Sequence, residues 1–137
     1  TTIAKESGIA WTTCSLDDSA SAAQAIVNDI TNIDFATPRA VQDSTGMDKS
    51  AMERILLLAD FSATLNGIFN DAANRAHAVL KTVPSTSVIR TLTLAVSGQT
   101  LANEVAVTDY ALSRPQSGEL TFSAPCVLGD GTTPTWS

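Results

Sequence analysis

Apolar and polar residues alternate along the second half of the chain in a pattern that predicts antiparallel strands. Apolar side chains alternate with small, polar or charged ones in 88–96, 104–110 and 120–124. Residues 97–99, with the sequence Ser-Gly-Gln, separate the first two stretches as a hairpin turn, and the polar segment 113–118 separates the last two. We therefore predict a β meander in this half of the chain.

The first half contains three further candidate strands. The mixture of Ile, Trp, Thr and Cys in 8–16 is typical of a half-buried strand, and 25–35 predicts a second strand with a bulge. The apolar run that begins at Ile55 passes into alternation, with Phe61 on the apolar side, and continues to Asn66. We predict that 55–66 forms a long central strand.

One helix is predicted over 72–82. Asn70 or Asp71 can accept hydrogen bonds from the free amides of its first turn, and Pro84 lies just beyond its end. Apolar residues recur inside the segment at helical spacing. We expect this helix to cover an opening in the β core.

We predict a single domain, 1–137, in which three segments lack periodic apolar content. Residues 1–7 predict a flexible N-terminal arm, 38–50 a long exposed loop, and 129–137 a C-terminal arm. Loops of about a dozen residues inside a compact domain are often functional. Trp136 is costly to leave in water, so we expect it to dock on another surface.

Composition narrows the partners that this chain can bind. Only 16% of its residues are charged while 44% are hydrophobic, so we expect much of its surface to face other protein. The net charge of −6 argues against gripping phosphate backbones, which requires Lys and Arg to displace counterions. No apolar run is long enough to cross a bilayer, and the start does not resemble a signal peptide, so an intracellular product without a membrane partner is favoured.

The residues that carry catalysis or bind metals are scarce and scattered. Cys14 and Cys126 have no nearby partner motif, so buried free thiols are favoured over a disulfide. His77 is the single histidine and is expected at the edge of the core or at the surface, since nothing local supports a dyad with either cysteine. Residues 43–48 and 129–131 contain acidic residues, yet ordinary turns explain them better than calcium loops. We predict no enzyme, no metal and no cofactor.

Two long stretches carry a family resemblance. The segment from Thr31 to Asn70 is TNIDFATPRAVQDSTGMDKSAMERILLLADFSATLNGIFN, and the segment from Ser117 is SGELTFSAPCVLGDGTTPTWS. Both resemble major tail tube proteins of long-tailed, siphovirus-type bacteriophages. The order of strands, loop and single helix between them is similar to that family across essentially the whole chain. The resemblance implies a mainly β fold, a sandwich or barrel of antiparallel strands with one flanking α-helix.

The resemblance also implies a function and a set of partners. Such proteins are structural subunits of the virion that stack as hexameric rings, a helical assembly whose channel carries DNA during ejection. The chain would be assembled in the host cytoplasm, would reside in the tail, and would contact the tape measure and the tail terminator or baseplate proteins. An acidic channel wall would let DNA slide without specific binding, because carboxylates repel phosphates.

Site residues follow from this resemblance as expectations. The loop 38–50 would reach an adjacent subunit or ring, the alternative being a mobile loop without a partner. Three acidic residues are candidates for channel charges, although exposure on the outer wall explains them equally well. The candidates for contacts between subunits are Arg39, Asp43, Met47, Asp48, Lys49 and Trp136; those for the channel are Glu104, Asp109 and Glu119.

Two other classes of protein share the composition. A capsid decoration protein, or another β-rich virion protein, would bind a preformed lattice as trimers or monomers instead of forming tubes. A carbohydrate-binding sandwich would need a row of exposed aromatic side chains, which is hard to build from residues expected in the core.

Overall fold

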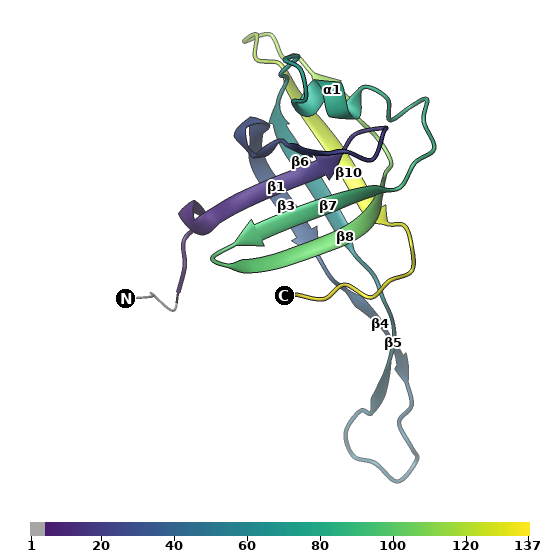
Figure 1. Cartoon of the computed structure of the whole chain (residues 1–137). Helices are drawn as coiled ribbons and strands as arrows, with labels where there is room; N and C mark the ends of the chain where they lie inside the picture. The colour runs from purple at the N-terminus through teal and green to yellow at the C-terminus, as the bar shows by residue number, and fades with distance from the viewer. Residues whose placement is uncertain (1–4) are drawn as a thin grey trace.

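The computed structural model describes residues 5–137 and shows two stacked β layers (Figure 1). All strand pairs are antiparallel, and the main sheet has the order β2-β1-β7-β8-β10-β6-β3, with β9 pairing to β10 beside this path. The strands are β1 (Trp11–Asp17), β2 (Ala23–Ala25), β3 (Ile30–Ala36), β6 (Ser62–Ile68), β7 (Arg90–Val96), β8 (Gln99–Val107), β9 (Ala111–Ser113) and β10 (Thr121–Leu128).

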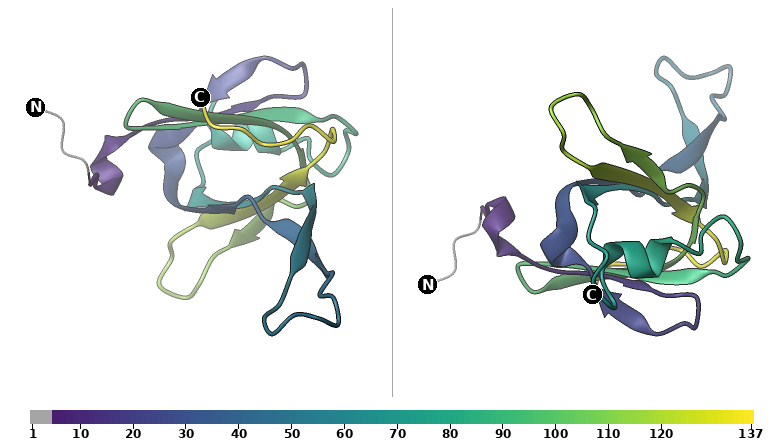
Figure 2. Two further views of the ribbon diagram at one scale, coloured as in Figure 1. Left: turned by 90° about the horizontal axis from the view of Figure 1, so that it is seen from below. Right: turned by 90° about the horizontal axis from the view of Figure 1, so that it is seen from above.

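The sheet folds over itself where β8 meets β10. The two strands pair over only three residues, Val105 to Val107 of β8, and the rest of the sheet then continues as a second layer. Figure 2 shows the two layers on either side of the core. The alternating inward side chains fill that core, as the period-two pattern requires. Its apolar members are Cys14, Leu16, Ile26, Phe61, Ala63, Leu65, Ala76, Val79, Leu80, Leu92, Leu94, Leu101, Val105, Phe122, Ala124 and Cys126.

The β7–β8 hairpin forms where the sequence predicted it. Val96 pairs with Gln99, and the two turn residues between them both have positive φ, 50° at Ser97 and 79° at Gly98. Positive φ at both central positions is the requirement of a type I′ turn, whose twist matches that of the flanking strands. The predicted β meander is likewise confirmed, since β7, β8 and β10 are neighbours in this order.

The helix is shorter than predicted. The prediction of helix over 72–82 is wrong at its start, since α1 covers only Ala76–Leu80. The Asn70 side chain accepts a hydrogen bond from the Ala72 amide in a local turn, and Asn74 has a φ of 62°, so the chain is not helical before Arg75. The helix caps one end of the sandwich, with Val79 and Leu80 in the core.

Two predicted strands are divided in the structure. The segment 25–35 contains the last residue of β2, a 3-10 turn η2 (Val27–Asp29) and then most of β3, because Asp29 turns inward to accept from the α1 amide of Ala76. The predicted central strand 55–66 breaks at Asp60, whose side chain accepts from the amide of Phe61 as that ring enters the core. It therefore forms β5 (Arg54–Ala59) and β6.

The predicted loop 38–50 is wrong over its first half. Arg39–Asp43 forms strand β4, which pairs with β5 in a separate two-stranded sheet. Polar residues in β4 do not prevent pairing, because ladder hydrogen bonds come from the backbone. The predicted N-terminal arm lies partly outside the described residues. It is followed by the short 3-10 turn η1 (Gly8–Ala10) and then β1, close to the predicted strand 8–16.

Candidate assembly surface

A two-stranded ribbon projects from the body of the domain at the end opposite α1 (Figure 1). We call residues 39–59 the arm; it contains β4, the connection 44–53 and β5. The arm continues the β3–β6 pair of the main sheet, and a backbone hydrogen bond of 2.9 Å from the Asp60 amide to the Pro38 carbonyl closes its base. Among the described residues, β4 and β5 pair only with each other.

The arm exposes large apolar side chains that its own chain does not cover. Leu58 is 87% exposed, and Val41, Ile55, Leu56 and Leu57 are between 41% and 56% exposed. Met47 and Met52 at the tip are exposed as well. Exposed apolar side chains concentrated on one ribbon make the arm a candidate for contact with another molecule.

The charged residues predicted for contacts between subunits make contacts within the arm. The Arg39 guanidinium donates to the Leu57 carbonyl from Nε at 3.1 Å and from Nη2 at 2.8 Å. Asp43 accepts hydrogen bonds from the amide and the hydroxyl of Thr45. Both bonds lower the pKa of the Asp43 carboxyl, and the bond from the hydroxyl has the larger effect. These side chains hold the ribbon in shape.

The other predicted contact residues lie in different places. Asp48 and Lys49 form an exposed ion pair of 4.0 Å in the connection 44–53, near the exposed Met47. Trp136 docks on its own domain, bridging to Leu101, with its ring centroid 5.9 Å from that of Phe35. About half of its surface remains exposed. The predicted set is therefore brought together only in part.

Sequence reasoning missed the apolar residues that dominate the arm. It assigned the run from Ile55 to Leu58 to a central strand in the core, where an uninterrupted apolar stretch is also expected. The position of this run could have indicated a separate ribbon, because the run follows directly on a polar segment and ends at the polar residue Asp60.

The three candidate channel charges do not form a cluster. Glu104 lies on the outer face of β8 and accepts from the Thr91 hydroxyl. Asp109 lies in the turn after β8, where it accepts from the Tyr110 amide, and Glu119 lies in the connection before β10, where it accepts from the Ser117 hydroxyl. Glu104 alone among them belongs to a sheet face.

Both outward faces of the main sheet lack basic side chains. Arg90 is the one lysine or arginine within its strands, and it points into the core. Most outward residues are small and neutral, with Asp34 as a carboxylate on the first face and Glu104 on the second. The neutral residues are Asn32, Ser62, Thr64, Asn66, Thr121 and Ser123 on the first face, and Thr13, Ser15, Thr91, Thr93, Thr100 and Ala102 on the second. Such faces offer no cation for a phosphate to bind.

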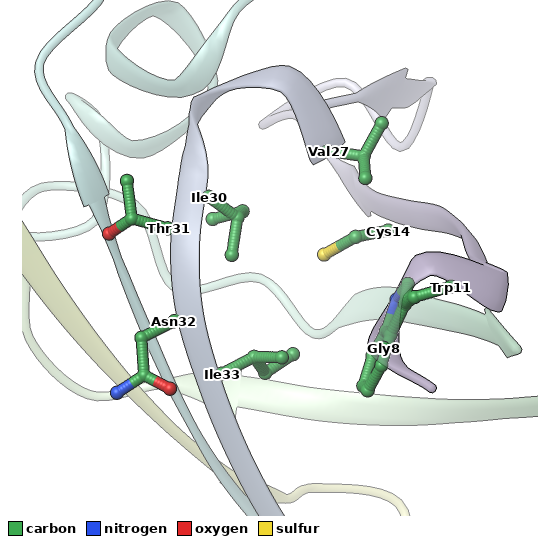
Figure 3. Close-up of a pocket in the computed structure, with 8 residues that line it drawn as sticks. All are labelled: Gly8, Trp11, Cys14, Val27, Ile30, Thr31, Asn32 and Ile33. Carbon is green, nitrogen blue, oxygen red and sulfur yellow. The ribbon is translucent and has the colours of Figure 1, made fainter. Parts of the chain in front are cut away.

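One hollow in the body of the domain has a cysteine in its lining and neither a histidine nor a carboxylate among the described residues that line it. A hollow of about 360 Å³ opens between β1 and β3, where Figure 3 shows Cys14, Ile30 and Ile33 pointing toward it. Burial raises the pKa of the Cys14 thiol to about 12, and that of Cys126 likewise to about 12, so both stay protonated near neutral pH. Both thiols are free and buried, as predicted.

The single histidine makes a structural contact. His77 lies half-buried at the core edge, as predicted, with Nδ1 3.1 Å from the Tyr110 hydroxyl. In residues 5–137, no group of three histidine, cysteine, aspartate or glutamate side chains gathers closely enough to hold a metal ion. Over the same range, no helix is long and apolar enough to span a membrane.

Comparison with known proteins shows which solved structures share this fold. No protein-family model matches the chain, and no curated protein matches its sequence. Among solved structures, it is similar to a chain of the virion of a native gene transfer agent particle, with a TM-score of 0.74 and 12% identity over 97% of this chain and 99% of that one. It is also similar to a chain of the tail of an empty gene transfer agent particle with C6 symmetry, with a TM-score of 0.75 and 14% identity over 97% and 98%. These similarities establish a shared fold: mainly antiparallel β layers with one helix, as predicted.

Proposed function

We propose that this chain is a structural, non-enzymatic subunit of a siphovirus-type tail tube, which polymerises as stacked hexameric rings around a channel for DNA. The observation that carries the proposal is the exposed apolar arm on a fold shared with a chain of a C6-symmetric tail. A second subunit that covers the exposed Leu58 side chain stabilises the complex, since burying a leucine contributes about 1.5–3 kcal/mol to association. The assembled tube would lie in the tail of the virion.

The geometry of the domain supports an open polymer. The arm leaves one end of the body, so its contact with a second copy joins two different surfaces. Contacts of this heterologous kind repeat from copy to copy and generate rings or filaments. Tape measure, terminator and baseplate proteins are the further partners that such a tube requires, with assembly in the host cytoplasm.

The composition of the sheet faces supports passage of DNA. Whichever face lines the channel presents mostly small neutral residues and no lysine or arginine, with Glu104 as the candidate charge on the β7–β8 face and Asp34 as the carboxylate on the β3–β6 face. Asp109 and Glu119 would then lie at the ends of the wall. DNA would slide through because the wall offers its phosphates no counterion.

Removal of the arm tests this function. Residues 39–59 are replaced by a two-residue Asn-Gly turn, which the Asp60–Pro38 hydrogen bond at the base permits. The shortened chain is expected to remain a folded monomer, measured by cooperative unfolding and by the fluorescence of Trp11 in the body. Wild-type chain should form hollow tubes by negative-stain electron microscopy and the shortened chain none. Tubes from the shortened chain would refute the role of the arm.

A further inference from the structure

We infer that the arm of each subunit is held between two other copies of the chain, one against each face of the ribbon. This inference rests on the proposed function and adds to it the number of subunits that each arm contacts. It follows from the register of the two strands and from the distribution of charge along the chain.

The register places apolar side chains on both faces of the ribbon. Val41 pairs directly with Leu56, so these two side chains share one face. Leu58 lies beyond a shift in register between Val41 and Arg39, where simple alternation no longer assigns a face. Ile55 pairs with Gln42 on the opposite face, where Leu57 joins it. All four β5 side chains are exposed, by 41% to 87%.

The sequence pattern of β5 differs from that of a ribbon that lies with one face on a single surface. Strands with one covered face alternate between apolar and polar residues, whereas strands covered on both faces contain uninterrupted apolar runs. The β5 sequence from Ile55 to Ala59 is an uninterrupted apolar run, yet neither face is covered within the described chain. One neighbouring surface would leave either Val41 and Leu56 or Ile55 and Leu57 in water.

The charge distribution identifies further copies of this chain as the two neighbours. Three basic residues of the arm balance its three acidic ones, so the net charge of −6 lies on the rest of the chain. A neutral arm can pack against acidic bodies without the repulsion that two bodies would feel. The residues in balance are Arg39, Lys49 and Arg54 against Asp43, Asp48 and Glu53.

The far end of the body supplies an apolar surface for the arm to meet. Ile68, Leu112 and Leu120 are all more than a third exposed there, at the end of the sheet opposite the arm. Hollows of about 330 Å³ and 320 Å³ share Leu112 in their linings. Copies that pack side by side bring these surfaces next to each other, so an arm from a third copy can contact both.

Paired substitutions test each face separately. One variant carries Val41→Asn and Leu56→Asn, and the other carries Ile55→Asn and Leu57→Asn. The control carries Val41→Met and Leu56→Met, which keeps both side chains apolar. Each asparagine variant is expected to lose about tenfold or more of its sedimentable polymer with unchanged monomer unfolding, since one buried leucine contributes more than a factor of ten to association. The methionine control should assemble like wild type.

Cross-linking counts the neighbours directly. A tagged chain carries a photoreactive benzoylphenylalanine at Leu56, at Ile55 or at both, and is diluted into a large excess of untagged wild type before assembly. Either single position should give tagged dimers after irradiation, and the double position tagged trimers.

The outcomes separate the inference from the function on which it rests. If wild-type tubes form but one asparagine pair assembles normally, or if the double position stops at dimers, the two-copy inference is wrong and the tube function stands. If wild-type chain forms no tube, the proposed function itself fails.

Discussion

Arg90 should be the most sensitive polar residue of the fold. Its buried guanidinium donates from Nη1 to the carbonyl of Asp17 at 3.0 Å and to that of Val79 at 2.8 Å, and from Nη2 to the Thr82 hydroxyl at 3.0 Å. It thereby joins β1, α1 and the segment after α1 to β7. Burial lowers the pKa of Arg90 while the charges of Asp18 and Asp17 oppose this, and the side chain stays protonated.

We expect Arg90→Met to lower the free energy of unfolding by about 3–4 kcal/mol. The substitution fills a similar volume but leaves two buried carbonyls, of Asp17 and Val79, without their donor, and each orphaned group costs about 1–3 kcal/mol. Relief from burying the cation offsets part of this loss. The total stability of a domain is about 5–15 kcal/mol, so the variant should unfold well below wild type.

Urea unfolding followed by circular dichroism measures the effect. Arg75→Met is the matched control, because Arg75 is exposed and donates a single bond to the Ala25 carbonyl, so its loss should cost no more than about 0.5 kcal/mol. Arg90→Lys should fall between the two, since an ammonium lacks the planar fork. Equal stability of Arg90→Met and Arg75→Met would refute the assigned role.

Three further predictions concern the core. Gly67→Ala should lower the free energy of unfolding by about 2–3 kcal/mol in urea, because the added Cβ would lie 2.1 Å from the Asp29 carbonyl oxygen. The control Gly8→Ala should be neutral, since the space around Gly8 is open, and equal effects of the two substitutions would contradict this packing. Asp29→Ala should cost about 2 kcal/mol, because its carboxylate accepts from the Ala76 amide and the Asn70 side chain; an unchanged midpoint would exclude this capping role. Stability should fall as pH rises from 9 toward 12, by about 1.4 kcal/mol per pH unit for each thiol. The unfolded thiols lose protons above their usual pKa of 9.0 while the native ones keep theirs to about 12, and removal of both thiols by alanine substitution should flatten this slope in thermal unfolding.

The body of the fold was predictable because local and tertiary preferences agree there. Alternation in β7 and β8 points the apolar side chains of Leu92 and Leu94 inward, and the Ser97-Gly98 turn fixes the register without help from distant residues. The helix was only partly predictable. Its first free amide is capped by Asp29, 47 residues away, and no local pattern carries that information.

The arm was misread for a different reason. An apolar run such as 55–58 has the same composition whether its partners lie in its own core or in another subunit. The charged residues expected to bind neighbours, such as Arg39 and Asp43, instead complete the hydrogen bonds of the ribbon. A surface for other molecules leaves no periodicity of its own, so exposure in the folded chain was needed to identify this candidate surface.

Electron cryomicroscopy of the assembled, purified chain tests the central claim most directly. We predict hollow tubes of stacked sixfold rings, with each arm buried between two copies and a channel wall without lysine or arginine. Solid filaments, closed trimers, or monomers that bind only to a preformed capsid lattice would contradict the account.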